Sequence, residues 1–319
     1  MTAPRMRPPF LNVVVPCYNE EEVLPATARQ LSALLDGMIA AGSVTPESGI
    51  YFVDDGSHDA TWASITQLCV NRPGFFHGIK LSRNQGHQSA VLAGLHNAPG
   101  DCLISIDADL QDDTAVIAAM VARYTEGHEI VYGVRQDRST DTTFKRLTAC
   151  GYYRLLIWLG VEMVQDHADF RLLGRSALNA LTKYKETNLF LRAIVPLLGF
   201  PSCRVYYDRK PRMAGESKYP LTKMIALAIN GITSFSMRPL RLITTLGLSM
   251  AAVSFVVGVW AIWIAMFSAR AVPGWASTVV PLAFVGGLQL LSMGVIGEYI
   301  GKIYLEVKRR PLYEIENIL

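Results

Sequence analysis

The sequence predicts an α/β domain with a mostly parallel sheet, followed by a hairpin of two long apolar helices. In the first half of the chain, short β-branched and apolar runs alternate with longer helical stretches. This order is typical of parallel sheets with helices on both faces. In the second half, two long runs contain no charged residue. A chain of 319 residues, of which 50% are hydrophobic, has room for both parts.

Five runs are the strand candidates of the sheet: residues 11–16, 50–54, 77–82, 102–107 and 129–134. In sheets of this kind, ligands bind at the carboxyl ends of the strands. The polar residues that directly follow each run are therefore the candidate site.

The two charge-free runs are long enough to cross a membrane. Residues 242–268 would rise roughly 40 Å as a helix and residues 276–297 about 33 Å, against a hydrocarbon core of about 30 Å. A short turn with Arg270, Pro273 and Gly274 separates them. Soluble helices seldom lack a polar face over such lengths. The runs therefore predict two tilted membrane spans, with a pair of buried core helices as the alternative.

Basic residues flank the outer ends of the two spans: Arg238, Arg241, Lys302, Lys308, Arg309 and Arg310, against Arg270 alone between them. The positive-inside rule then places the large domain and both termini on the cytoplasmic side of the inner (cytoplasmic) membrane, in a multi-pass protein. Residues 1–9 contain no apolar h-region, so no secretory signal is expected.

Two further segments, residues 144–160 and 220–237, are helical in pattern and rich in Leu, Ile and aromatic residues. They predict helices in the membrane interface, with ordinary core-facing helices as the alternative. The expected domains are a sheet domain over residues 1–219, an interfacial helix over 220–239, the hairpin over 240–301 and a cytoplasmic tail over 302–319.

Composition excludes several classes of function. A net charge of +3 is too small to favour nucleic acid as a partner, whereas basic residues near the spans suit an anionic membrane surface. Five cysteines without C-x-x-C spacing suit a reducing compartment and disfavour zinc or a disulfide framework. The chain has no G-x-G-x-x-G and no G-x-x-x-x-G-K-[ST], which disfavours a dinucleotide dehydrogenase and a P-loop NTPase.

Polar clusters follow the first two strand candidates. The first, Pro16-Cys17-Tyr18-Asn19-Glu20, would bring a ring and carboxylates to the sheet edge, where they could grip a base and a ribose. The second, Asp54-Asp55-Gly56-Ser57, offers carboxylates to a base N–H or ribose hydroxyl. Its glycine permits a sharp turn and its serine suits a helix cap. Each cluster alone can equally be an ordinary turn.

A third cluster follows the fourth strand candidate. Asp107, Asp109 and Gln111 place two carboxylates and an amide oxygen around one strand end. Mg²⁺ is usually held by one or two carboxylates plus substrate phosphates, so these residues suit a metal that neutralises a diphosphate leaving group. An isolated Asp-x-Asp is more often a turn. Its position, in register with the two earlier clusters, favours the metal site.

These clusters, in this order and spacing, resemble the inverting glycosyltransferases of the GT-A fold, family two. Three segments resemble its polyprenyl-phosphate branch: residues 81–87 (LSRNQGH), 169–173 (DFRLL) and 212–218 (RMAGESK). Residues 231–236, 239–241 and 297–302 resemble the bactoprenol glucosyltransferases of O-antigen modification. The resemblance covers about residues 11–311. Dolichyl-phosphate mannose synthase is a more distant relative that shares the catalytic domain.

The resemblance implies a Rossmann-like nucleotide-sugar domain and a role for each matching residue. The uridine would be held by Pro16, Tyr18, Glu20 and Asp54. The ribose and diphosphate would be lined by Asp107 and Ala108, and Arg135 would also reach the donor. Asp109 and Gln111 would ligate Mg²⁺ or Mn²⁺. Arg212 and Lys218 would close over the diphosphate, and the lipid phosphate would meet Lys145 or Arg146.

The resemblance nominates Asp169, two residues before Arg171, as the catalytic base. A phosphate acceptor has a second pKa of about 6, so little proton transfer remains to be done at neutral pH. We therefore predict that Asp169 orients Arg171 or the sugar hydroxyls, with a supporting buried ion pair as the alternative. Relatives often carry lysine where this chain has His87, and the predicted site includes no histidine.

The implied reaction transfers one sugar, with glucose as first choice, from a UDP-sugar to undecaprenyl or another polyprenyl phosphate with inversion. The Q-x-x-R-W segment of processive synthases is absent, so one sugar per lipid is expected. The resemblance also implies a homo-oligomer, with a tetramer as the candidate form. The alternatives are transfer from GDP-mannose, and a nucleotide-sensing membrane scaffold without transfer. The matches at Asp109, Asp169 and residues 212–218 disfavour the scaffold.

Overall fold

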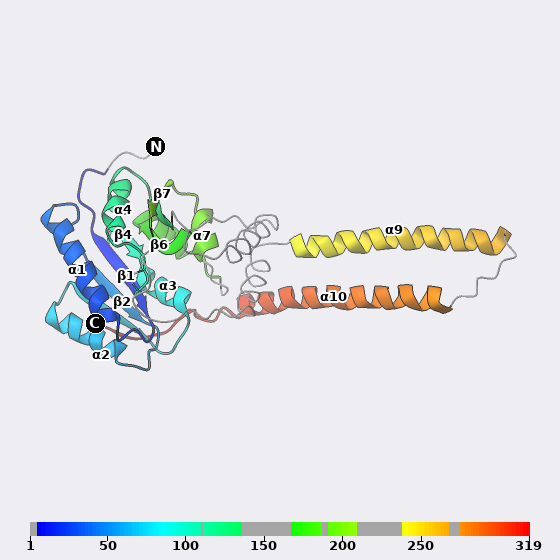
Figure 1. Ribbon diagram of the computed structural model, residues 1–319, viewed down its shortest axis with the longest axis horizontal. Helices are drawn as coiled ribbons and strands as arrows, with labels where there is room; N and C mark the ends of the chain where they lie inside the picture. Colours follow the sequence, from blue (N-terminus) through cyan, green and yellow to red (C-terminus); the bar gives the residue numbers. More distant parts are fainter. Residues whose placement is uncertain (1–4, 110, 136–166, 187–190, 209–237, 268–274) are drawn as a thin grey trace. The chain divides into compact units, whose positions relative to one another are not determined.

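The computed structural model describes residues 5–109, 111–135, 167–186, 191–208, 238–267 and 275–319. The described residues divide into two compact units. One contains the sheet, its helices and the last residues, Arg309–Leu319. The other contains the two long helices α9 (Arg238–Phe267) and α10 (Trp275–Lys308) (Figure 1). Of the tail predicted over residues 302–319, residues 302–308 lie in α10, and Arg309–Leu319 belong to the sheet unit.

The described strands form one sheet in the order β7-β5-β6-β4-β1-β2-β3-β8. All five predicted strands are confirmed, with bounds that differ by at most two residues from the prediction. They are β1 (Leu11–Cys17), β2 (Gly49–Asp54), β3 (Phe76–Leu81), β4 (Cys102–Ser105) and β5 (Ile130–Arg135). The sequence did not predict the other three, β6 (His167–Gly174), β7 (Ser202–Tyr207) and β8 (Ile315–Ile318).

The sheet is mostly parallel, as predicted. β1 pairs in parallel with β2 and β4, β2 with β3, and β5 with β7. β6 lies antiparallel between β4 and β5, and β8 lies antiparallel to β3. The parallel strands β1 to β4 therefore bring their carboxyl ends to one edge.

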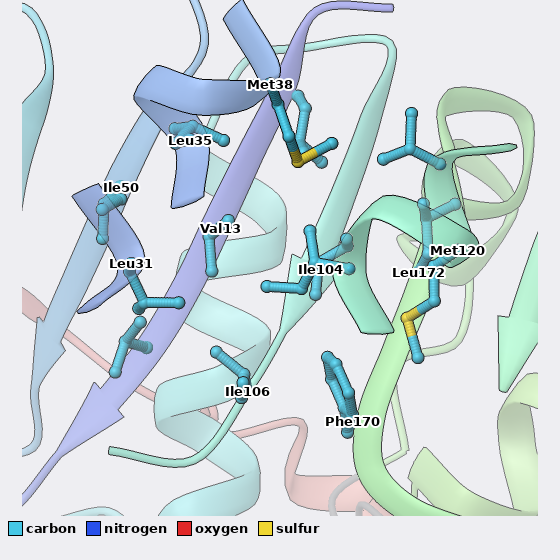
Figure 2. Packing of buried hydrophobic residues seen from close by; sticks show 14 of the residues in the cluster. Val13, Leu31, Leu35, Met38, Ile50, Ile104, Ile106, Met120, Phe170 and Leu172 are labelled. Carbon is cyan, nitrogen blue, oxygen red and sulfur yellow. The ribbon is translucent and has the colours of Figure 1, made fainter. Parts of the chain in front are cut away.

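The helices of the sheet unit are α1 (Leu24–Ala40), α2 (Thr61–Asn71), α3 (His87–Asn97), α4 (Val116–Thr125), α6 (Arg175–Leu181) and α7 (Leu191–Leu197). Side chains along a strand point alternately to its two faces. Val13 of β1 belongs to a buried apolar cluster with Leu31 and Leu35 of α1 (Figure 2). Cluster residues on neighbouring strands include Ile50, Ile104, Phe170 and Leu172 (Figure 2).

The helix α3 packs on the opposite face of β1 and β2. A Cβ added at Gly94 would clash with Val14 of β1 and Val53 of β2, so only a glycine lets this helix lie so close to the sheet. The close packing fixes the amino end of α3, which begins at His87, near the carboxyl ends of the parallel strands.

The hairpin unit carries the apolar surface expected of it. In the described part of the chain, one segment, Phe284–Lys308, is long and apolar enough to cross a membrane. It overlaps the second predicted span. The first predicted span falls almost entirely within α9, where large apolar side chains such as Phe255 and Trp263 are exposed. Its crossing of a membrane stays a prediction, and the two predicted interfacial helices lie outside the described residues.

Candidate active site

A pocket of about 290 Å³ lies at the carboxyl ends of β1 to β4 in the sheet unit. Its lining comes from the polar clusters after these strands: Pro16, Cys17, Tyr18, Glu20, Asp55, Asn84, Gly86, His87, Ala90, Asp107, Ala108 and Asp109. The structure therefore gathers four segments that are far apart in the sequence around one cavity. Among the lining residues are most of the predicted nucleotide-sugar contacts and the predicted metal ligand Asp109.

The two aspartates after β2 have different surroundings. The carboxylate of Asp55 lines the pocket and accepts the backbone N–H groups of Gln85 at 2.7 Å and Gly86 at 2.9 Å. Asp54 is fully buried and accepts the N–H of Ser57 at 3.3 Å, and burial raises its pKa. Asp55, rather than Asp54, is thus the aspartate that lines the pocket. The predicted uridine contact of Asp54 stays a prediction.

Two glycines allow the loop between β3 and α3 to approach the turn after β2. Gly56 has a φ of 68°, and a Cβ there would lie 2.6 Å from the backbone of Arg83 and Asn84. Gly86 has a φ of 90°, a conformation that favours glycine. Its N–H is one of the two that bind Asp55. The loop, residues 82–86, is therefore held beside the pocket by hydrogen bonds to a carboxylate.

The end of β4 supplies two more carboxylates to the pocket, Asp107 and Asp109. Burial raises the pKa of Asp107 to about 6. The N–H of Gln111 donates to Asp109 at 3.2 Å, and the Gln111 side chain is buried. Within the described ranges, no group of three or more His, Cys, Asp or Glu side chains is arranged to hold a metal ion. Two carboxylates in one pocket still fit a divalent cation that takes its other ligands from phosphates and water.

Asp169, near the start of β6, is surrounded by donors. Arg171 donates to its Oδ1, and Arg192 of α7 donates from Nε at 3.2 Å and from Nη2 at 3.1 Å. The amide of Gln88 in α3 donates at 3.2 Å, and the hydroxyl of Ser105 donates to the backbone carbonyl of Asp169 at 2.6 Å. The predicted pairing of Asp169 with Arg171 is thus present, inside a larger cationic cluster.

His87 connects this cluster to the pocket. Its Nε2 lies 3.5 Å from Oδ1 of Asp107 and 3.5 Å from Oδ2 of Asp169. Burial opposes the charged forms of both His87 and Asp169. The hydrogen bond between them and the charges around them outweigh burial, so the pKa of His87 is raised and that of Asp169 is held well below its ordinary value. Asp169 is therefore a weak proton acceptor.

Several of the predicted site residues have side chains that lie outside the described part of the chain. Arg135 ends β5, but its side chain is outside the described part, and the same holds for all of Lys145, Arg146, Arg212 and Lys218. The structure also shows contacts at residues that the predicted site left out: Asp55, Asn84 and His87, which lie in motifs noted in the sequence, and Gln88 and Arg192, which do not. The acidic pair Asp54-Asp55 at the end of a strand is the signal that points to Asp55.

Carboxylates at the ends of parallel strands line the pocket, and an aspartate clamped by arginines is linked to it through His87, as expected for the glycosyltransferase class that the sequence resembles. Comparison with known families supports this class. Residues 12–182 match the family described as Glycosyl transferase family 2, and residues 238–303 match the one described as GtrB C-terminal hairpin. The chain belongs to glycosyltransferase family 2.

Relatives are similar over almost the whole chain. The uncharacterized glycosyltransferase YkoT of Bacillus subtilis is 52% identical over 97% of this chain and 91% of its own length. The prophage bactoprenol glucosyl transferase homolog of Escherichia coli is 38% identical over 97% and 99%. The bactoprenol glucosyl transferase of Shigella phage SfV is 39% identical over 96% and 98%. These relatives therefore match both the sheet unit and the hairpin.

Proposed function

We propose that this glycosyltransferase transfers glucose from UDP-glucose to undecaprenyl or another polyprenyl phosphate, with inversion at the anomeric carbon and release of UDP. The observation that carries the proposal is the similarity, over nearly the full length of both chains, to proteins named as bactoprenol glucosyl transferases. The pocket at the strand ends supports it, because it combines an aromatic ring at Tyr18 with carboxylates at Glu20, Asp55, Asp107 and Asp109.

In the proposed reaction, an acceptor phosphate oxygen attacks the anomeric carbon. The bond from that carbon to the β-phosphate oxygen of the donor breaks, and its electron pair leaves with UDP. Asp107 and Ala108 would line the ribose and diphosphate, while Asp109 and Gln111 would hold Mg²⁺ or Mn²⁺. The bound metal would supply positive charge for the departing diphosphate. Arg135, Arg212 and Lys218 would add charge on the donor side, and Lys145 or Arg146 on the lipid side.

Asp169 would position groups rather than take a proton. Its low pKa makes it a poor base, and the acceptor phosphate is mostly dianionic above about pH 6. Its two arginine partners, Arg171 and Arg192, are fixed by its carboxylate. A carboxylate that fixes two guanidinium groups can preorganise positive charge for phosphates.

We also propose that the hairpin places the sheet domain at the cytoplasmic face of the membrane with two spans, residues 242–268 and 276–297. The lengths of α9 and α10, 30 and 34 residues, and the match to the hairpin family support this arrangement. The catalytic domain would comprise residues 1–219, and the protein would act as a homo-oligomer.

The test is a transfer assay with the full-length protein, undecaprenyl phosphate and four labelled donors: UDP-glucose, UDP-galactose, UDP-N-acetylglucosamine and GDP-mannose. We expect labelled lipid to form fastest from UDP-glucose, with the inverted anomeric configuration by NMR. Transfer from GDP-mannose alone would favour the mannose-synthase alternative. Binding of UDP without transfer from any donor would favour the sensing scaffold.

A further inference from the structure

The last residues of the chain add a strand to the edge of the catalytic sheet. β8 pairs antiparallel with β3, with Ile79 opposite Ile318 and Lys80 opposite Asn317. Gly78 and Leu319 exchange two backbone hydrogen bonds, of 3.2 Å and 2.8 Å. Without β8, the described part of the sheet would end at β3 with unpaired backbone groups. The C-terminal segment, residues 313–319, therefore completes the sheet after the chain has passed through the hairpin.

The C-terminal segment also contacts both sides of the loop over residues 82–86. Ser82, which follows β3 directly, donates its N–H to the carbonyl of Glu314 at 3.0 Å. The hydroxyl of Tyr313 lies 3.1 Å from Nδ1 of His96, in the last turn of α3. The loop thus begins at a residue bound to the segment, and it ends at a helix that the segment also contacts.

The loop over residues 82–86 forms part of the pocket wall. Asn84 and Gly86 line it directly, and His87 lines it from the first position of α3. The N–H groups of Gln85 and Gly86 hold the carboxylate of Asp55. A displacement of the loop or of α3 would therefore move Asp55 and His87 together, and with them one wall of the pocket.

We propose that the C-terminal segment is a positioning element for the donor pocket: by binding β3, Ser82 and α3, it sets the position of the loop over residues 82–86. The residues that follow Lys308, the last residue of α10, belong to the sheet unit and lead into the C-terminal segment. The choice of UDP as the probe below rests on the proposed function. The positioning role itself rests on the contacts alone.

The experiment compares the full-length protein with two variants, Tyr313→Ala and a deletion of residues 312–319. UDP binding is measured by calorimetry, and backbone hydrogen exchange is followed across residues 82–88. We expect the deletion to weaken UDP binding about tenfold and Tyr313→Ala about threefold. In both variants, the amides of Gln85 and Gly86 should exchange faster than in the unmodified protein.

Two controls separate positioning from general stability. Glu316→Gln removes a partly exposed ion pair between Glu316 of β8 and Lys80 of the neighbouring strand β3, and such surface pairs contribute little. It should leave UDP binding within about twofold of the unmodified protein. A peptide of residues 311–319 added to the deletion variant should restore UDP binding and slow exchange, because the free edge of β3 can accept a strand.

A lowered melting temperature with unchanged UDP affinity and unchanged exchange at Gln85 and Gly86 would overturn the proposal and leave the segment a purely stabilising role. If the deletion variant does not fold, Tyr313→Ala in the full chain decides the question in the same way. If the unmodified protein does not bind UDP, the proposed donor is wrong. Exchange at Gln85 and Gly86 still tests the positioning role in that case.

Discussion

The carboxyl end of β4 and the amino end of β6 are neighbours in the sheet, yet the pKa of an aspartate is shifted in opposite directions at the two ends. At the end of β4, burial raises the pKa of Asp107 to about 6, and nearby acidic residues add to the effect. At the start of β6, the Asp169 side chain is less exposed, at 9% against 35% for Asp107, yet its pKa is well below the ordinary value because donors surround it. Burial alone therefore does not decide the charge of a carboxylate; its neighbours do.

The two ends differ in the charge that a bound group would have to bring. The β4 end gathers the carboxylates Asp107 and Asp109 in the pocket, and in the proposed function a cation from outside would complete it. The β6 end contains its own cations, Arg171 and Arg192, and is suited to anionic groups. The predictions below test this difference, from the largest expected effect to the smallest.

The largest effect is expected at the β4 end. Asp109→Asn should reduce turnover by about a thousandfold or more, because a lost metal ligand leaves the diphosphate charge uncompensated. Excess EDTA should reproduce the loss in the unmodified protein. Asp113→Asn, in the same segment but away from the pocket lining, is the matched control and should remain active. Full activity in EDTA would show that the β4 end needs no cation.

At the β6 end, Asp169→Asn should lower kcat by about a hundredfold, while UDP affinity changes less than about twofold. The reason is that Asp169 holds arginines rather than lining the donor pocket. The remaining activity should still follow ionisation of the lipid phosphate at about pH 6. Loss of that pH dependence, together with rescue by added bases, would instead identify Asp169 as a general base.

A smaller effect is expected at Arg192, which contacts Asp169 through two nitrogen atoms. Arg192→Lys keeps the charge but loses the two-point geometry, so kcat should fall about tenfold, and Arg192→Gln should lower it further. Arg123→Gln, which removes an exposed pair with Glu126, serves as the control. Equal activity of Arg192→Gln and the unmodified protein would show that Arg171 alone supplies the charge.

The smallest effect concerns stability. Because the pKa of Asp169 is lowered in the folded state, its charge contributes stability above the unfolded pKa of about 3.9, and this contribution is lost as pH falls. The stability advantage of the unmodified protein over Asp169→Asn should therefore narrow by about 1 kcal/mol between pH 7 and about pH 3. Melting curves of both proteins between pH 7 and about pH 3 measure this change in the stability difference. A constant difference would mean that Asp169 is not held charged by its partners.

The sequence predicted β1 to β5 because these strands are mostly apolar and mostly buried, which leaves a clear pattern. β8 was not predicted because its four residues, IENI, are mostly exposed and form a strand only by pairing with β3. The site residues also fall into two groups, those that the sequence pattern indicated and those that only the packing brings together. Tyr18, Asp107 and Asp109 stand directly after strands. Gln88 and Arg192 come from two helices, and only the packing of α3 and α7 near β6 brings them to Asp169.

The place of β8 in the chain also has a consequence for how the protein is made. Translation delivers β8 only after both helices of the hairpin, so the nascent sheet has an open edge at β3 while the most apolar part of the chain is being synthesised. Domains generally begin to fold during synthesis from the amino-terminal side, and an open strand edge can pair with other chains. If the hairpin enters the membrane as proposed, both of its helices are synthesised before the sheet can close. A chain stalled between these two events would present a free β3 edge to its neighbours.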